Sequence, residues 1–293
     1  MKPLLIIGSG GQLARAFAEL CPDAIILDRS KADLSQPHNL TETLEKYDPA
    51  AVINTAAYTQ VDNAEAEEGL ATAINAQSPA AMAIYCAAKH IPLVHFSTDY
   101  VFDGSGDTPW HEDDTPAPLN AYGRSKLAGE DAITHVGGRY LILRTSWLYD
   151  ARGKNFLNTI LRLAAEREEL RIVDDQFGAP TYTPHLANAV LDVLDVAMEL
   201  PKFPSGVYHL CNQGYTTWYG FATAIIIHAR RLGMQLKVRS IIPTPTSEYP
   251  VPAKRPHNSR LDCSKALSQF GVSLPTWQEG LAECMELKST PRA

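Results

Sequence analysis

The sequence predicts an α/β fold built on a Rossmann-type, doubly wound parallel sheet, with a smaller C-terminal α/β part. Three observations favour this class. Short apolar runs alternate with helical stretches over the first half of the chain, a glycine turn follows the first run, and 293 residues suffice for one large domain and a smaller one. We expect residues 1–150 to form the sheet domain and residues 151–293 to form mainly a second part, interleaved with the first.

The first half supplies the strands and helices of a βαβ pattern in order. Residues 4–7 read as a buried strand that runs straight into a glycine turn. Ser35 is a candidate N-cap, and Pro37 lies in the first turn of the helix that ends near residue 47. The predicted strands are 4–7, 24–27, 51–54, 92–97 and 140–145, and the predicted helices are 12–20, 35–47, 78–89 and 120–134.

The alternation loosens after residue 150. Residues 156–167 and 184–199 are predicted to be helices, and residues 170–173 and 207–210 short strands. The segment 243–256 has prolines at positions 243, 245, 250, 252 and 256. Because proline donates no backbone hydrogen bond, we expect an extended loop there instead of regular structure.

Composition and charge exclude several classes of function. The net charge of −7 argues against a nucleic-acid partner. The longest apolar runs are far shorter than the roughly 20 residues of a membrane span, and the N-terminal run is too short for a signal peptide. The five cysteines are scattered and form no CxxC pair, which favours reduced thiols in the cytoplasm and indicates no metal site.

The glycine turn indicates a dinucleotide site. Gly8 permits a tight turn after the first strand, and Gly11 lets the backbone approach a pyrophosphate at the helix N-terminus. Ala14 stands where a small residue allows close packing of helix on strand. We therefore expect residues 1–150 to bind NAD(P) and the later part to bind substrate.

Two neighbouring residues give opposite signals about the cofactor. Asp28 ends the second strand about twenty residues past the turn, where a carboxylate accepts hydrogen bonds from the ribose hydroxyls of NADH. Arg29 beside it can pair with the 2′-phosphate of NADPH. The alternative is that Asp28 and Arg29 are only a solvated charge pair after the strand and bind no cofactor. We expect both NADPH and NADH to be used.

A Tyr–Lys pair suggests acid–base chemistry. Tyr122 and Lys126 are four residues apart on a predicted helix, and so on one face. A free phenol has a pKa near 10, and an ammonium one turn away is expected to lower it toward neutral pH. Thr98, at the end of the fourth strand, provides a hydroxyl that can bond to a substrate carbonyl beside Tyr122.

With the YxxxK pair, the glycine turn and the strand-end Ser97-Thr98, the sequence resembles the extended short-chain dehydrogenase/reductases. The resemblance runs from residue 4 to about residue 277, and it is strongest in the segments 95–104, 122–130, 144–149, 175–181 and 255–261. Among these enzymes the chain is similar to those that reduce nucleotide sugars. The resemblance implies reduction of the C4 ketone of dTDP-4-dehydro-L-rhamnose by NADPH or NADH.

The resemblance also implies roles for individual residues. Tyr122 would donate the proton, Lys126 would be its electrostatic partner, and Thr98 would tune it. The residues that would bind the cofactor are Gly8, Gly11, Gln12, Leu13, Asp28, Arg29, Asp33, Leu34, Ala57, Tyr58 and Thr59, together with Tyr122 and Lys126. Substrate contacts would come from Thr98, Asp99, Trp147, Arg255 and Asn258.

Structural roles remain open for several of these residues. Trp147 fits a core position, and Asp33 fits a helix entry. Arg255 and Asn258 fit loop anchors about as well as contacts to a diphosphate or thymine. His95 lies on an apolar strand, which favours a hydrogen-bonded core histidine over a catalyst.

Some relatives place a magnesium-binding glutamate in the first helix, at a dimer interface. Ala16 occupies that place here, so we expect no metal, although a homodimer stays possible. Two other functions remain open: a related nucleotide-sugar reductase or epimerase with different stereochemistry, and a non-catalytic regulatory subunit of the same fold. The intact Thr98, Tyr122 and Lys126 argue against the second.

Overall fold

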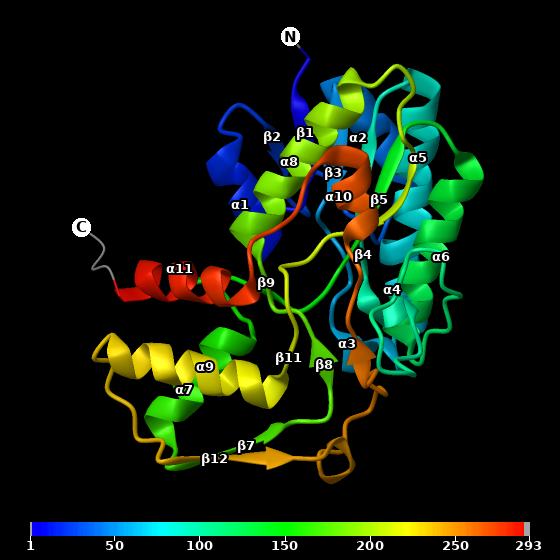
Figure 1. The fold of residues 1–293 in the computed structure, drawn as a ribbon. Helices are drawn as coiled ribbons and strands as arrows, with labels where there is room; N and C mark the ends of the chain where they lie inside the picture. The colour runs from blue at the N-terminus through cyan, green and yellow to red at the C-terminus, as the bar shows by residue number, and fades with distance from the viewer. Residues whose placement is uncertain (1, 290–293) are drawn as a thin grey trace.

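A six-stranded parallel sheet forms the centre of the computed structural model, in which residues 2–289 are described (Figure 1). Its strands are β1 (Leu4–Ile7), β2 (Ile25–Leu27), β3 (Ala51–Asn54), β4 (Leu93–Thr98), β5 (Tyr140–Thr145) and β10 (Gly206–His209). The order across the sheet is β2-β1-β3-β4-β5-β10. The chain order changes direction between β1 and β3, which is where such sheets bind ligands. The predicted doubly wound sheet is confirmed.

Helices cover both faces of this sheet, because successive apolar side chains of each strand point to opposite faces and both faces must be buried. Ile6 points to one face and packs with α1 (Gln12–Leu20), α8 (Thr183–Glu199) and α10 (Ser264–Phe270). Leu5 and Ile7 point to the other face, toward α2 (Leu40–Tyr47), α5 (Ser78–Lys89) and α6 (Ala121–Val136). Figure 1 shows α8 crossing one face and α5 and α6 on the opposite side.

A second layer lies beyond the carboxyl ends of the strands. It contains the helices α7 (Phe156–Glu166), α9 (Trp218–Arg231) and α11 (Trp277–Ser289), and the parallel pair β7 (Glu169–Val173) and β12 (Ser240–Thr244). Tyr149, Phe221 and Leu281 are fully buried in its core. The main sheet also recruits residues after 150, since β10 and α8 belong to it, so the chain passes repeatedly between the two layers.

Short elements complete the chain. The strands are β6 (Leu148–Tyr149), β8 (Phe177–Gly178), β9 (Thr181–Tyr182), β11 (Thr216–Thr217) and β13 (Asn258–Ser259). The helices are α3 (Val61–Ala64), α4 (Glu68–Thr72), the π-helical turn η2 (Ala73–Gln77) and the 3₁₀ turns η1 (Pro37–Asn39), η3 (Asp99–Val101) and η4 (Thr246–Glu248). None of the helices within residues 2–289 combines the length and apolar content that a membrane span requires.

Two local predictions were wrong. Ser35 does not cap a helix, because its amide and hydroxyl both donate to Asp33 Oδ1, at 2.9 and 2.8 Å, and the 3₁₀ turn begins only at Pro37. The proline-rich segment is not wholly irregular. Pro243 lies within β12, an edge strand where proline is tolerated, and η4 follows.

Candidate active site

The glycine turn joins β1 to α1 as predicted, and its geometry requires glycine. Gly8 has φ = 102°, and a Cβ there would lie 2.9 Å from Thr55 Oγ1. Gly11 is the N-cap of α1, and no side chain caps the helix. The first amide groups of α1 are therefore open to an anion, as pyrophosphate binding requires.

A cavity of about 570 Å³ extends from this turn past the ends of β2 and β3. Eight of the predicted cofactor residues line one end or the middle of it: Gly8, Gly11, Asp28, Arg29, Asp33, Leu34, Ala57 and Thr59. A second cavity, of about 490 Å³, shares Gly10, Gly11, Thr55, Ala57 and Thr59 with the first. The two are thus adjoining parts of one cleft.

The two residues that bear on cofactor choice follow the carboxyl end of β2. Asp28 Oδ1 accepts hydrogen bonds from the Ser30 hydroxyl at 2.6 Å and from the Ser30 amide at 3.0 Å. These bonds lower the pKa of Asp28 below its usual range, and the bond from the Ser30 hydroxyl has the largest effect. The Arg29 guanidinium is 78% exposed and lies 3.4 Å from Asp33 Oδ1. Arg29 is therefore free to turn toward an added phosphate at little cost.

The second cavity brings the predicted catalytic residues together with the glycine turn. Thr98, Tyr122 and Lys126 line it, as do Asp99 and Trp147, and Gln12 and Leu13 line its opposite end. Asn120 caps α6 by accepting the Gly123 amide at 2.8 Å, which fixes the turn that carries Tyr122. One cleft therefore contains both the predicted cofactor-binding residues and the predicted acid–base residues; we call these two parts its cofactor end and its acid–base end.

The expected lowering of the Tyr122 pKa was wrong for this structure. Burial raises the pKa of Tyr122 to about 12, although a hydrogen bond with Thr98 opposes the rise. The Lys126 ammonium does not offset the burial, because Nζ donates to Phe96 O at 2.5 Å and lies 3.2 Å from His95 Nε2. Burial also lowers the pKa of Lys126 to about 8.

His95 is a hydrogen-bonded core histidine, as the sequence indicated. It is 1% exposed, and its Nδ1 lies 3.1 Å from Asn54 Nδ2. Asn54 Oδ1 accepts the Ala56 amide at 3.2 Å, which fixes the orientation of the Asn54 side chain. Burial first, and then the Lys126 charge, hold the pKa of His95 well below its usual range. His95 is therefore a neutral ring that lies against Lys126, a contact that the sequence analysis did not foresee.

Asp99 is a buried carboxyl at the wall of the second cavity. It is 3% exposed, and Oδ1 accepts the Thr98 hydroxyl at 3.0 Å. Within residues 2–289, no protein group bonds to Oδ2. Burial raises the pKa of Asp99 to about 6, although the Ser259 and Thr98 hydroxyls oppose the rise. A buried acceptor of this kind suits a sugar hydroxyl.

Trp147 lies at the junction of the two layers in a conformation rare for a residue with a side chain. Its φ is +48°, and its ring stacks on Trp218 with 3.5 Å between the ring centroids. Gly178 makes room for it, since a Cβ there would lie 2.6 Å from Trp147 Cε2. Backbone strain held by surrounding packing is common at functional sites. No sequence pattern links Trp147 with Trp218.

A third cavity, of about 360 Å³, contains Arg255. Rings and cations line it: Tyr100, Phe156, Trp218, Tyr249, Arg171 and Arg255. Arg255 Nη2 lies 2.8 Å from Asp62 Oδ2. Tyr100 packs edge to face on Tyr122, with 5.8 Å between centroids, so this cavity adjoins the acid–base end of the cleft. Aromatic faces and guanidinium groups suit a base and a diphosphate.

Two residues that were predicted to contact a ligand form structural hydrogen bonds instead. Asn258 is 2% exposed, and its Nδ2 donates to Thr108 O at 2.7 Å, which anchors the loop. Both backbone groups of Tyr58 bond to the Asn75 side chain, and its hydroxyl donates to Glu67 Oε2 at 2.6 Å. Neither residue lines the cleft or the third cavity.

The place expected for a metal-binding glutamate is apolar here. Ala16 is 3% exposed and packs in the core beneath α8. Glu19, one turn later, is paired with Arg152. In residues 2–289, no group of three or more His, Cys, Asp or Glu side chains is arranged to hold a metal ion.

Comparison with known proteins places this geometry in a family. The model of the RmlD substrate binding domain matches residues 1–289. The chain belongs to this family. It is 44% identical to the dTDP-4-dehydrorhamnose reductases of Burkholderia thailandensis, with 96% of this chain and 97% of that one aligned, and of Escherichia coli K12, with 95% of each aligned.

A solved structure of the same kind shares the fold. The Bacillus anthracis dTDP-4-dehydrorhamnose reductase, crystallised with NADP, superposes with a TM-score of 0.89 at 35% identity, over 98% of this chain and all of that one. This family membership agrees with the expected extended reductase fold.

Proposed function

We propose that the protein reduces the C4 ketone of dTDP-4-dehydro-L-rhamnose to give dTDP-L-rhamnose, with NADPH or NADH as the hydride donor. The observation that carries the proposal is the single cleft that joins the glycine turn to Thr98, Tyr122 and Lys126. The names of the 44%-identical relatives and the NADP in the Bacillus anthracis structure support it.

The residues present fit a nicotinamide dinucleotide. The uncapped N-terminus of α1 would hold the pyrophosphate, and Gly8 lets the backbone approach it closely. Asp28 and Arg29 would face the adenosine ribose or its phosphate. When bound, the cofactor supplies the hydride.

Tyr122 would then give its phenol proton to the substrate oxygen that becomes the C4 hydroxyl. Its raised pKa keeps that proton in place at neutral pH, and an alkoxide is basic enough to take it. The Thr98 hydroxyl and the Lys126 ammonium would stabilise the phenolate left behind. Asp99 would orient the sugar by accepting a hydroxyl, and Trp147 would flank it.

The division of labour between the two parts belongs to the same proposal: residues 1–150 bind the cofactor, and residues 151–293 bind mainly the substrate. It is supported by the linings of the cavities. All residues around the adenosine end precede residue 75. By contrast, Phe156, Arg171, Trp218, Tyr249 and Arg255 line the third cavity, where we place the dTDP group.

The test is a turnover assay with purified protein, NADPH and the dTDP-keto-sugar, followed by nuclear magnetic resonance of the product. We expect oxidation of NADPH and a product with L-rhamno stereochemistry. A 6-deoxytalose product would establish the related reductase instead, and absence of turnover would favour the regulatory subunit.

We also infer a cytoplasmic location and a homodimer. Five free cysteines support the location, because an oxidising compartment would favour disulfides. Light scattering on a sizing column tests the dimer, with 32.1 kDa as the mass of one chain.

A further inference from the structure

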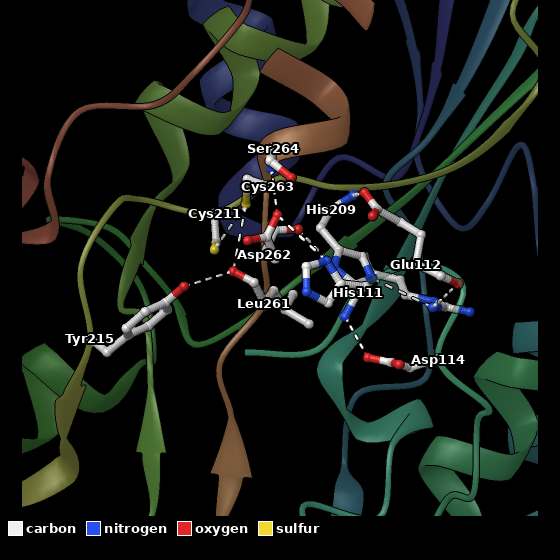
Figure 2. Close-up of polar contacts among 11 residues, drawn as sticks. His111, Glu112, Asp114, His209, Cys211, Tyr215, Leu261, Asp262, Cys263 and Ser264 are labelled. Atoms are coloured by element: carbon white, nitrogen blue, oxygen red, sulfur yellow. Dashed lines mark hydrogen bonds and ion pairs between the residues drawn. The ribbon is translucent and has the colours of Figure 1, made fainter. Parts of the chain in front are cut away.

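Two cysteines from distant parts of the sequence meet near the end of β10. Cys211 follows that strand by two residues, and Cys263 is the N-cap residue of α10. Their Sγ atoms are 3.5 Å apart across 52 residues of chain, and both thiols are free (Figure 2). A disulfide bond is about 2.05 Å long, so the sulfurs need to approach by only about 1.5 Å.

A surface cavity gives access to this pair. It measures about 310 Å³, and both cysteines line it together with Gly214, Tyr215, Ser264 and Leu267. The Tyr215 hydroxyl donates to Leu261 O at 3.1 Å, which joins one wall of the cavity to the segment before Cys263 (Figure 2). Cys211 is 3% exposed, whereas Cys263 is only half-buried. A small reagent that enters the cavity therefore reaches Cys263 first.

The surroundings of Cys211 make the two thiols differ in reactivity. Its hydrogen bond with Cys263 and its burial raise the pKa of the Cys211 thiol well above the usual range. Because the thiolate is the attacking species, Cys211 is the poorer nucleophile toward an incoming reagent. It is nevertheless in contact with the Cys263 sulfur, so it is well placed to attack once Cys263 has reacted.

We propose that Cys211 and Cys263 form a modification site, which a low-molecular-weight disulfide such as oxidised glutathione converts to an intramolecular disulfide. The Cys263 thiolate attacks one glutathione sulfur, forming a mixed disulfide and releasing one glutathione. Cys211 then attacks Cys263 Sγ and releases the second glutathione. The two cysteines lose two electrons and two protons, and oxidised glutathione gains both, as two thiols.

The two cysteines flank the segments that hold Asp99. Ser259, which lowers the pKa of the Asp99 carboxyl against the effect of burial, lies four residues before Cys263. Cys211 packs with Val101, the last residue of the 3₁₀ turn that begins at Asp99, and with Phe102, which follows it. The cross-link therefore ties together two supports of the substrate end of the cleft. This consequence rests on the proposed function: the KM for the nucleotide sugar should change at least threefold, and the KM for NADPH should not.

The experiment treats the reduced full-length protein with oxidised glutathione, alkylates the remaining thiols, and maps the products by mass spectrometry. We expect the free thiols to fall from five to three, with one linked peptide pair containing Cys211 and Cys263. The melting temperature should rise by about 5 °C, because the link closes a long loop. Five free thiols, or a stable glutathione adduct on Cys263 without the cross-link, would overturn the proposal.

Single variants separate the two steps. Cys211→Ser should stop at a glutathione adduct on Cys263, and Cys263→Ser should leave Cys211 unmodified. Cys21→Ser is the matched control, because Cys21 is also half-buried but has no cysteine beside it among the contacts of residues 2–289, and cross-linking should persist. An unchanged sugar KM in fully cross-linked protein would refute the link to Asp99. If reduced protein has no turnover, the proposed function fails, whereas the thiol mapping is unaffected.

Discussion

Tyr122 is held as a neutral phenol inside the cleft, since burial raises its pKa to about 12. In Tyr122→Phe the ring and its packing on Tyr100 remain, but the transferable proton is lost. Turnover should fall by roughly 10²–10⁴-fold with the fold intact. Steady-state rates and circular dichroism measure the two effects. Tyr85→Phe is the control. It also removes a buried hydroxyl, one that donates to Leu44 O away from the cleft, and it should leave turnover unchanged. Near-normal activity in Tyr122→Phe would remove this residue from its role.

Lys126 should make the reaction sensitive to mildly alkaline pH. Burial lowers its pKa to about 8, so the ammonium is present below that pH and lost above it. The phenolate that forms at Tyr122 needs the positive charge, and kcat/KM should therefore decline as the pH rises through about 8. Lys126→Arg keeps a charge at higher pH, and it should shift the decline to more alkaline pH at a lower maximal rate. A profile flat to pH 10 in the native protein would show that the charge at Lys126 is not needed.

Arg29 should select between the two cofactors. Its exposed guanidinium can pair with a 2′-phosphate, while the Asp28 carboxylate beside it repels that group. Both cofactors should work, with NADPH somewhat preferred. Arg29→Ala should raise the KM for NADPH about tenfold, equivalent to about 1.4 kcal/mol, and leave NADH nearly unchanged. Cofactor titrations measure both constants, with Lys31→Ala as the control for loss of a neighbouring cation. Equal losses for both cofactors would place selectivity elsewhere.

At the scale of elements, α6 depends on its cap. Asn120 accepts the Gly123 amide at 2.8 Å and donates to Lys254 O at 2.8 Å, so it joins the catalytic helix to the proline-rich segment. Asn120→Ala should cost about 2 kcal/mol of unfolding free energy, about half from each bond. Asn120→Ser keeps a capping hydroxyl and loses the amide that reaches Lys254 O. Thermal denaturation should rank the native protein above Asn120→Ser and Asn120→Ala below both; equal stability of the two variants would mean the cap contributes little.

The elements that the sequence predicted well are those whose pattern has a local cause. Helix α5 was predicted at its observed bounds, and the strands of the main sheet to within a residue, because continuous apolar runs mark buried parallel strands. Helix α9 was missed. Phe221 and Ile225 lie on the buried side of this helix and pack with α7 and α11. Gly220 lowers the helix propensity of its first turn, which weakens the sequence signal. Ser35 was misread because its bonds to Asp33 compete with the cap.

At the scale of the whole molecule, the surface of α1 bears on metal dependence. Ala16 is buried and Glu19 is paired with Arg152, so this helix offers no free carboxylate at the expected metal position. Chelator should therefore change neither turnover nor the elution volume on a sizing column. The control is the same protein with added magnesium chloride, which should also have no effect. A chelator-induced shift to a smaller species would reveal a metal held by other carboxylates.

Prediction of the site was limited by what only tertiary structure decides. The glycine turn and the Tyr–Lys pair are local patterns, and the residues of both line the cleft. Three other features join residues far apart in sequence: the stack of Trp147 on Trp218, the contact of Lys126 with His95, and the two backbone bonds of Tyr58 to Asn75. The direction of the Tyr122 pKa also depends on burial, which spacing alone does not reveal.

The tryptophan stack gives the molecule a built-in optical probe. Trp147 lines the second cavity and Trp218 the third, and their rings are nearly parallel, with an angle of 10° between planes. A ligand that enters either side alters the polarity around one indole while the other remains covered. Binding on either side should therefore change the combined emission of the stacked pair before any chemistry, in a chain whose other tryptophans, Trp110 and Trp277, lie outside both cavities.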